Sequence, residues 1–149
     1  MGHCTKRHSN TSLFSNNIHF PTHTRYLKIN MAKSTTTYKN FLDHSNASWV
    51  PVQGLEGQVE EVTLSIDPTT GEYTRLTRFY PGADTTSFGG KIHPYPEEVF
   101  IVSGRLYDQA FDIWLEAGHY ASRPPFELHG PFRTEIGCVV LEVSFPNRT

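Results

Sequence analysis

The sequence lacks the features of several large protein classes. Its 149 residues contain only two cysteines, Cys4 in a polar stretch and Cys138 in an apolar run, so a disulfide framework is not expected. Cys138 is instead predicted to be a small buried apolar residue. No segment approaches the roughly eighteen apolar residues of a membrane-spanning helix. These absences argue against a disulfide-rich module and against an integral helical membrane protein.

Motifs for phosphate binding and for serine hydrolysis are missing as well. The chain has no phosphate loop and no dinucleotide fingerprint, and Ser122 lacks the glycine frame of a hydrolase nucleophile. Four of the 13 Lys and Arg residues precede residue 31, whereas all 15 Asp and Glu residues follow it. The acidic remainder shows no basic stripe with interleaved aromatic residues, so nucleic-acid binding is disfavoured.

Residues 1–30 differ in composition from the rest of the chain. They are basic, rich in Ser, Thr, Asn and His, and free of acids, which predicts a disordered leader. Such a segment also loosely resembles an organellar transit peptide. We expect a cytoplasmic protein. Import into an organelle through residues 1–30 is the alternative. Residues 31–149 are expected to form a single domain, long enough to bury one core.

The domain has the pattern of an all-β protein. Its 11 glycines and 10 prolines separate short apolar or alternating runs. Strands are predicted at 59–66, 72–80, 98–102, 119–123 and 138–145. We expect Ser103 and Gly104 to form a turn and residues 105–115 to supply two short strands, while Tyr38, Phe41 and Leu42 indicate only a weak element. The spacing of strands and turns favours a β-sandwich or a small barrel.

Two segments carry residues with metal-ligand spacing. His93 precedes Glu97 by four residues across a Pro-Tyr-Pro turn, and His129 follows a Pro-Pro pair further on. Glu97 is preferred over Glu98 as a ligand because successive side chains of a strand point to opposite faces. If the segments are neighbouring strands, two imidazoles and one carboxylate converge. That set leaves coordination positions open and suits Fe(II), with Zn(II) or Mn(II) as alternatives.

The same two segments resemble the paired motifs of the cupin superfamily. In the first motif, His93, Glu97 and Gly104 match the family pattern, while Lys91 stands at the position of the first histidine. The run from Glu97 to Gly104 is most similar to ChrR-like and small-molecule dioxygenase-like cupins. A further similarity is to the cupin-type oxidoreductases of fungal secondary metabolism.

The second motif matches in register at Gly118, Pro124 and His129. Phe126 and Arg133 replace a glycine and an asparagine of the family pattern. The resemblance implies an RmlC-like double-stranded β-helix, or jelly roll, with a metal in its lumen and a homodimeric assembly. It also implies three protein ligands, because a lysine must lose a proton before it can donate a lone pair.

Further residues near the two motifs are candidates for substrate binding. Aromatic members would form a wall for a planar ligand, and cationic members would neutralise an enolate or phenolate oxygen. The alternative is that they are ordinary core residues and solvated strand ends. The candidates are Lys91, Tyr95, Trp114, Tyr120, Arg123 and Arg133.

Together these patterns predict a metal-dependent oxidoreductase of the dioxygenase-like type. Its substrate would be a small aromatic or enolisable carbonyl metabolite, as in secondary metabolism, with His93, Glu97 and His129 as catalytic metal ligands. Three alternatives remain. One is a zinc- or ligand-sensing binding module, one is a metal-assisted lyase or isomerase with the same site, and one is a degenerate barrel in which the histidines are only hydrogen-bonded.

Overall fold

Two strand-forming runs separated by a turn segment form the first hairpin. In the computed structural model, which describes residue 40 and residues 48–147, strand β2 (Val59–Ile66) pairs antiparallel with strand β3 (Tyr73–Phe79). Asp67 closes the connecting turn, because its Oδ1 atom accepts the Thr69 N–H at 2.8 Å. The hairpin predicted from the sequence is therefore confirmed.

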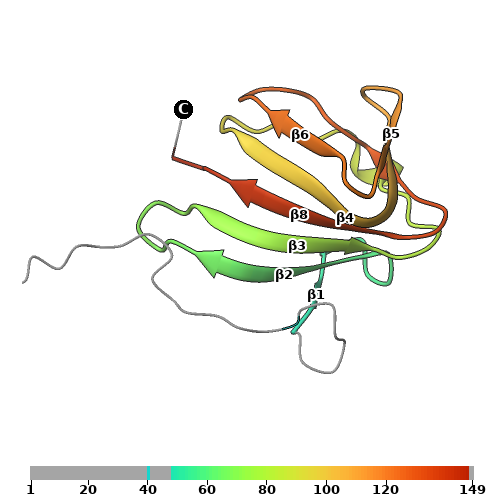
Figure 1. Ribbon diagram of the computed structural model, residues 1–149, viewed down its shortest axis with the longest axis horizontal. Coiled ribbons are helices and arrows are strands. Elements are labelled where there is room, and N and C mark those ends of the chain that lie inside the picture. The colour runs from blue at the N-terminus through green and yellow to red at the C-terminus, as the bar shows by residue number, and fades with distance from the viewer. Residues whose placement is uncertain (1–39, 41–47, 148–149) are drawn as a thin grey trace, which may run out of the picture.

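The strands form an antiparallel sheet with the most C-terminal strand near its centre (Figure 1). Strand β8 lies between β3 and β4, so no ladder joins β3 directly to β4. The first half of β4 also pairs with β6, and its second half pairs with β5 and β7. The remaining elements are β1 (Val50–Pro51), the 3-10 helix η1 (Thr86–Phe88), β4 (Glu97–Asp108), β5 (Ile113–Glu116), β6 (Tyr120–Arg123), β7 (Phe132–Arg133) and β8 (Cys138–Ser144).

Strand β4 bends in its middle and serves both halves of the sheet system. Its pairing with β8 shifts register between Ile101 and Ser103, and Gly104 adopts a φ of 74°. The turn predicted at Ser103 and Gly104 is wrong, because the strand continues to Asp108. The first short strand expected in residues 105–115 is thus the second half of β4, and β5 is the other.

Inward-facing side chains give the fold one core. Along β8 the residues at every second position are buried, and Cys138 is among them, as predicted. The buried apolar cluster consists of Leu55, Val59, Phe79, Ala83, Val99, Ile101, Leu106, Leu115, Phe132, Cys138 and Val140. The all-β prediction is confirmed, and the strands that line the interior come from both ends of the described chain.

Strand register also places polar side chains in rows across the inner face of the sheet. One row crosses four strands. In it Tyr73 pairs with Ser144, Ser144 pairs with Glu97, and Glu97 pairs with Arg123. The next row joins Arg75 to Glu142 and Val99. Since neighbours in a row face the same side, the ladder itself gathers charged groups at one end of the interior.

The leader predicted at 1–30, the boundary at Met31 and the weak element around Tyr38 lie outside the described residues. Within residues 40 and 48–147, no helix reaches the length and apolar character needed to cross a membrane. The cytoplasmic location stays a prediction.

Candidate metal centre

Three separate segments bring the predicted ligands together. Glu97 is the first residue of β4, and His129 lies in the connection between β6 and β7. The segment that carries His93 is tied to His129 by an isolated bridge, in which the Lys91 N–H donates to the His129 carbonyl at 2.8 Å and the His129 N–H donates back at 3.0 Å. This backbone pairing sets the two imidazoles next to each other.

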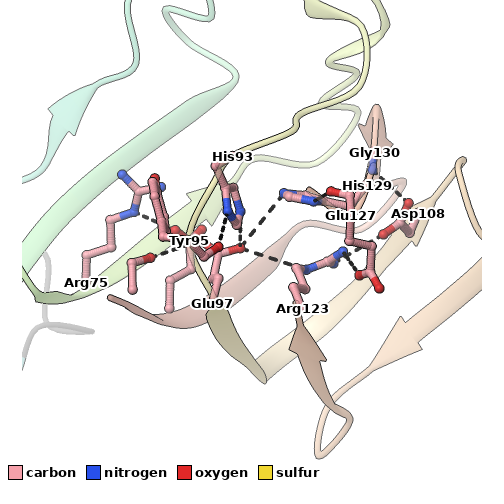
Figure 2. A network of polar contacts seen from close by, with 11 residues as sticks. Arg75, His93, Tyr95, Glu97, Asp108, Arg123, Glu127, His129 and Gly130 are labelled. Atoms are coloured by element: carbon pink, nitrogen blue, oxygen red, sulfur yellow. Dashed lines mark hydrogen bonds and ion pairs between the residues drawn. The ribbon is translucent and has the colours of Figure 1, made fainter. Parts of the chain in front are cut away.

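The three side chains converge on one point (Figure 2). Glu97 Oε2 lies 3.7 Å from His93 Nε2 and 3.9 Å from His129 Nε2, and the three potential ligand atoms all lie within 4.8 Å of one another. Ligand atoms bound at ~2.1 Å to a common ion are separated by about 3 to 4 Å. The observed spacing is therefore close to that of a metal site.

Backbone carbonyls orient both imidazoles. His93 Nδ1 lies 2.6 Å from the Tyr95 carbonyl oxygen, and His129 Nδ1 lies 3.1 Å from the Glu127 carbonyl oxygen. A carbonyl only accepts hydrogen bonds, so in each ring Nδ1 carries the proton and Nε2 presents its lone pair. His93 Nε2 is buried and has no hydrogen-bond partner. A buried nitrogen lone pair of this kind fits a divalent metal.

Burial and neighbouring charges keep His129 neutral. The His129 side chain is only 3% exposed, and burial together with the Arg123 cation lowers its pKa to about 4. Burial and the nearby Glu142 raise the pKa of Glu97, while His93 and Arg123 oppose that shift. The Ser144 hydroxyl donates to Glu97 Oε1 at 3.1 Å, which leaves Oε2 facing the histidines.

Arg123 lies beside this triad, buried and paired. Its side chain is 4% exposed, and its Nη2 donates to Asp108 Oδ2 at 3.2 Å. The Nε atom lies 3.9 Å from Glu97 Oε2, and Nη1 lies 3.9 Å from Glu127 Oε1. The alternative that Arg123 is a solvated strand end is therefore wrong, because its place in the inner row of β6 buries it.

A cavity of about 450 Å³ opens next to the triad. Lys91 and Tyr95 line it, and the Tyr95 ring stacks on the His93 ring at 4.3 Å between centroids. Its lining combines polar side chains with the apolar side chains of Phe79, Leu106, Leu115 and Phe132. The space suits a compact organic molecule that carries both apolar and polar groups.

The structure does not bring Trp114, Tyr120 or Arg133 to this cavity. Trp114 packs on Tyr107 and beneath Arg105 because its neighbour on β5, Leu115, takes the inward position. Tyr120 is 58% exposed and lines a separate hollow, and Arg133 lies over the outer face of Tyr107. Strand alternation turns all three away from the triad.

Sequence reasoning missed three cavity residues on β3 and β8. Arg75 Nε donates to Glu142 Oε2 at 2.5 Å, and Arg75 Nη1 donates to Glu61 Oε2 at 2.9 Å. Burial alone would raise the pKa of Glu142, but Arg75 and Lys91 hold it below its usual value. Burial raises the pKa of Tyr73 to about 12, so its hydroxyl stays protonated. The sequence did carry one signal for Glu142, because it is a charged residue at an inward position of a mostly apolar strand.

The arrangement offers two imidazole nitrogens and one carboxylate oxygen on one side of an open cavity. Such a facial set leaves coordination positions free for water, dioxygen or substrate oxygen atoms. The donor types do not select among Fe(II), Mn(II) and Zn(II). A divalent metal site is the chemistry that the geometry supports.

Comparison with known proteins gives the site a context. A family model described as the ChrR Cupin-like domain matches residues 37–146. No curated protein sequence matches the chain.

Solved structures with the same fold include several small cupins and an enzyme. An RmlC-like cupin from Shewanella frigidimarina is 16% identical, with a TM-score of 0.57 over 69% of this chain and 86% of that one. The polyketide cyclase RemF from Streptomyces resistomycificus is 18% identical, with a TM-score of 0.59 over 76% and 82%. A candidate dioxygenase from Nostoc punctiforme is 21% identical, with a TM-score of 0.59 over 70% and 35%. These similarities confirm the expected jelly roll and concern the fold alone.

Proposed function

This chain belongs to the ChrR cupin-like domain family, and we propose that it is a metal-dependent oxidoreductase of the dioxygenase-like type. The observation that carries the proposal is the convergence of His93, Glu97 and His129 within 4.8 Å at the wall of a cavity. Both imidazoles already present Nε2 to that point. These three residues would hold Fe(II), or alternatively Mn(II) or Zn(II).

When bound, the metal would supply a Lewis acid and a template that holds substrate and dioxygen side by side. In a dioxygenase reaction both oxygen atoms of O2 enter the product, so O2 is the only oxidant and no separate reductant is consumed. The chain's own part is to bind and orient the substrate. The apolar side chains of the cavity lining would also exclude water from the bound substrate.

The cavity favours a small aromatic or enolisable carbonyl compound, such as a secondary metabolite. Its volume of about 450 Å³ fits a compact molecule, and Tyr95 and Phe132 offer faces for a planar one. Among the described residues no carboxylate lies within ion-pair distance of Lys91, which lines the same space. Its ammonium would therefore neutralise an enolate or phenolate oxygen.

The test combines metal loading with oxygen uptake. The protein is purified without a histidine tag, loaded anaerobically with Fe(II), and screened against small phenols and 1,3-diketones in an oxygen electrode. We expect one oxygen consumed per substrate consumed, and no consumption by the Zn(II)-loaded protein or by a His129→Ala variant. Failure of Fe(II), Mn(II) and Zn(II) to bind would end the proposal.

A metal-assisted lyase, isomerase or cyclase reaction is the second candidate. The observation that favours it is the pair Glu142 and Tyr73 on the cavity wall, since these groups can accept or donate protons. Consumption of a substrate without oxygen uptake would select this candidate. Ligand or Zn(II) binding with no turnover of any compound would select the sensing module.

The homodimer expected from the family resemblance stays a prediction. Sedimentation of the purified chain tests it, and monomeric behaviour at micromolar concentration would contradict it.

A further inference from the structure

We propose that Asp108 and Arg123 form one charge-balanced positioning unit that holds Glu97 and His129 in place for the metal. The inference rests on the proposed metal site and adds two residues that are not metal ligands, of which Arg123 also lines the cavity. It assigns them a joint role: Arg123 orients the carboxylate ligand, and Asp108 both holds Arg123 and cancels its charge. Figure 2 shows the contacts that link them.

The unit is buried at the junction of three segments. Asp108 ends β4 and is 1% exposed, and the Arg123 side chain at the end of β6 is 4% exposed. Their hydrogen bond, from Arg123 Nη2 to Asp108 Oδ2, measures 3.2 Å. A buried ion pair is weak evidence for a role in stability alone, because apolar residues of the same volume often stabilise a fold as well or better. Its position beside two ligands calls for another explanation.

Arg123 acts on the carboxylate ligand. Its Nε is buried, has no hydrogen-bond partner, and lies 3.9 Å from Glu97 Oε2. The same oxygen lies 3.7 Å from His93 Nε2 and 3.9 Å from His129 Nε2. Two of these three nitrogens offer lone pairs, and only the Arg123 nitrogen can donate a proton. The charge of Arg123 thus attracts the Glu97 carboxylate at ion-pair distance, while the two imidazole lone pairs remain for the metal.

Asp108 acts on the histidine segment. Its Oδ1 accepts the N–H of Gly130, the residue after His129, at 2.8 Å, and also the N–H of Ala110 at 3.1 Å. One carboxylate therefore holds the backbone next to His129 through one oxygen and Arg123 through the other. Glu97 and His129 lie on different segments. Asp108 contacts Arg123, which lies beside Glu97, and Gly130, which follows His129 in the chain.

Charge balance explains why an acid must accompany this arginine. A guanidinium in a buried site repels a divalent cation placed beside the same carboxylate, and the low dielectric strengthens the repulsion. Asp108 cancels that charge at hydrogen-bond distance. Removal of the Asp108 charge should leave an unbalanced cation next to the site, whereas removal of both charges should restore the balance.

The experiment measures Zn(II) and Co(II) affinity of the full chain and of three variants. Asp108→Asn retains an oxygen for the Gly130 N–H but loses the negative charge, so we expect metal affinity to fall about 10- to 100-fold. Glu135→Gln removes the acid of a surface pair with Arg105 and serves as the matched control, with unchanged affinity. The double variant Asp108→Asn/Arg123→Gln should regain at least half of the loss on a logarithmic scale.

A purely structural role predicts a different pattern. It would lower the unfolding temperature of Asp108→Asn and leave metal affinity and the Co(II) absorption spectrum as in the parent, and the double variant would be no better than the single one. Parent-like metal affinity in Asp108→Asn would overturn the inference, and so would a double variant that binds no better than Asp108→Asn. If the parent itself bound no metal, the proposed function would fail instead.

A conservative variant covers the case in which Asp108→Asn does not fold. Arg123→Lys keeps the charge, but a single ammonium cannot reach Asp108 and Glu97 at once. We expect this variant to bind Co(II) more weakly and with a shifted absorption spectrum, because the carboxylate loses its orientation. Parent-like affinity and spectrum in Arg123→Lys would contradict the inference.

Discussion

Lys91 and His129 pair through two backbone hydrogen bonds, so a lysine stands directly beside a candidate metal ligand at the position where the cupin motif has its first histidine. The lysine ammonium repels a divalent cation, whereas an imidazole would supply a fourth ligand. We predict that Lys91→His raises Zn(II) affinity by about tenfold or more. Lys91→Met is the control for loss of charge alone and should give a smaller gain. Equal gains in both variants would show that residue 91 does not reach the metal.

Loss of one imidazole should abolish tight metal binding. His129→Ala removes a ligand that is buried and neutral, and we expect Zn(II) affinity to fall by about 100-fold or more. His119→Ala, which alters an exposed histidine away from the triad, is the matched control. Calorimetric titration measures both. Unchanged binding in His129→Ala would place the metal elsewhere.

Gly104 should tolerate no side chain. A Cβ atom there would lie 2.0 Å from the Gly137 carbonyl oxygen, and the residue has a φ of 74°. We predict that Gly104→Ala lowers the free energy of unfolding by about 3 kcal/mol or more, through the clash and the backbone strain together. Gly82→Ala shares the positive φ but meets no atom within 4 Å, so its cost should be about 1 kcal/mol. Urea denaturation checks the difference, and equal costs would contradict it.

Glu142 should depend on Arg75 for its place in the interior. Arg75→Met leaves a buried carboxylate without its closest partner, and we expect a loss of about 3 to 5 kcal/mol in unfolding free energy. The double variant Arg75→Met/Glu142→Leu should recover most of that loss. If the double variant were less stable than the single one, the pair would not be coupled as described.

Cys138 should be an unreactive thiol in the folded protein. Burial raises its pKa from 9.0 to about 12, so at pH 8 we expect its reaction with a disulfide reagent to be more than about 100-fold slower than after unfolding. The test uses a Cys4→Ser variant, which leaves one thiol. Fast reaction of the native form would show that the thiol is accessible.

The raised pKa of Cys138 also makes the stability of the fold depend on pH in a definite direction. Between pH 9 and about 12 the unfolded chain releases the Cys138 proton while the folded chain keeps it. The folded state then binds more protons, so its stability falls as the pH rises through that range. A Cys138→Ala variant should show a shallower fall, measured by urea denaturation at each pH.

The convergence of His93, Glu97 and His129 was predictable from the sequence, because local spacing and strand alternation constrain where these side chains lie. His93 and Glu97 are four residues apart, and the resemblance to the second cupin motif indicated His129 as the third member. The hairpin of β2 and β3 was predictable for the same reason, since turn residues and alternation agree there. The cupin resemblance and the all-β fold are confirmed.

The features that the sequence did not predict depend on tertiary contacts. Ser103 and Gly104 have the local chemistry of a turn, and only the close approach of Gly137 explains a glycine inside a strand. Trp114 and Tyr120 occupy outward positions that the sequence did not distinguish from inward ones. Asp108 belongs to the site through a hydrogen bond to Gly130, 22 residues away, which no local pattern reveals.

The central place of β8 has a consequence for the order in which the molecule is made. Among the described strands, the hairpin with Arg75 and the strand with Glu97 share no ladder, and β8 is the strand that joins them. A ribosome synthesises β8 after every other described strand, so the two halves of the cavity stay separate until translation has passed Ser144. The cavity wall that carries Arg75 and Glu142 is therefore completed by the last long-range pairing, whereas His93, Glu97 and His129 all precede β8 in the chain.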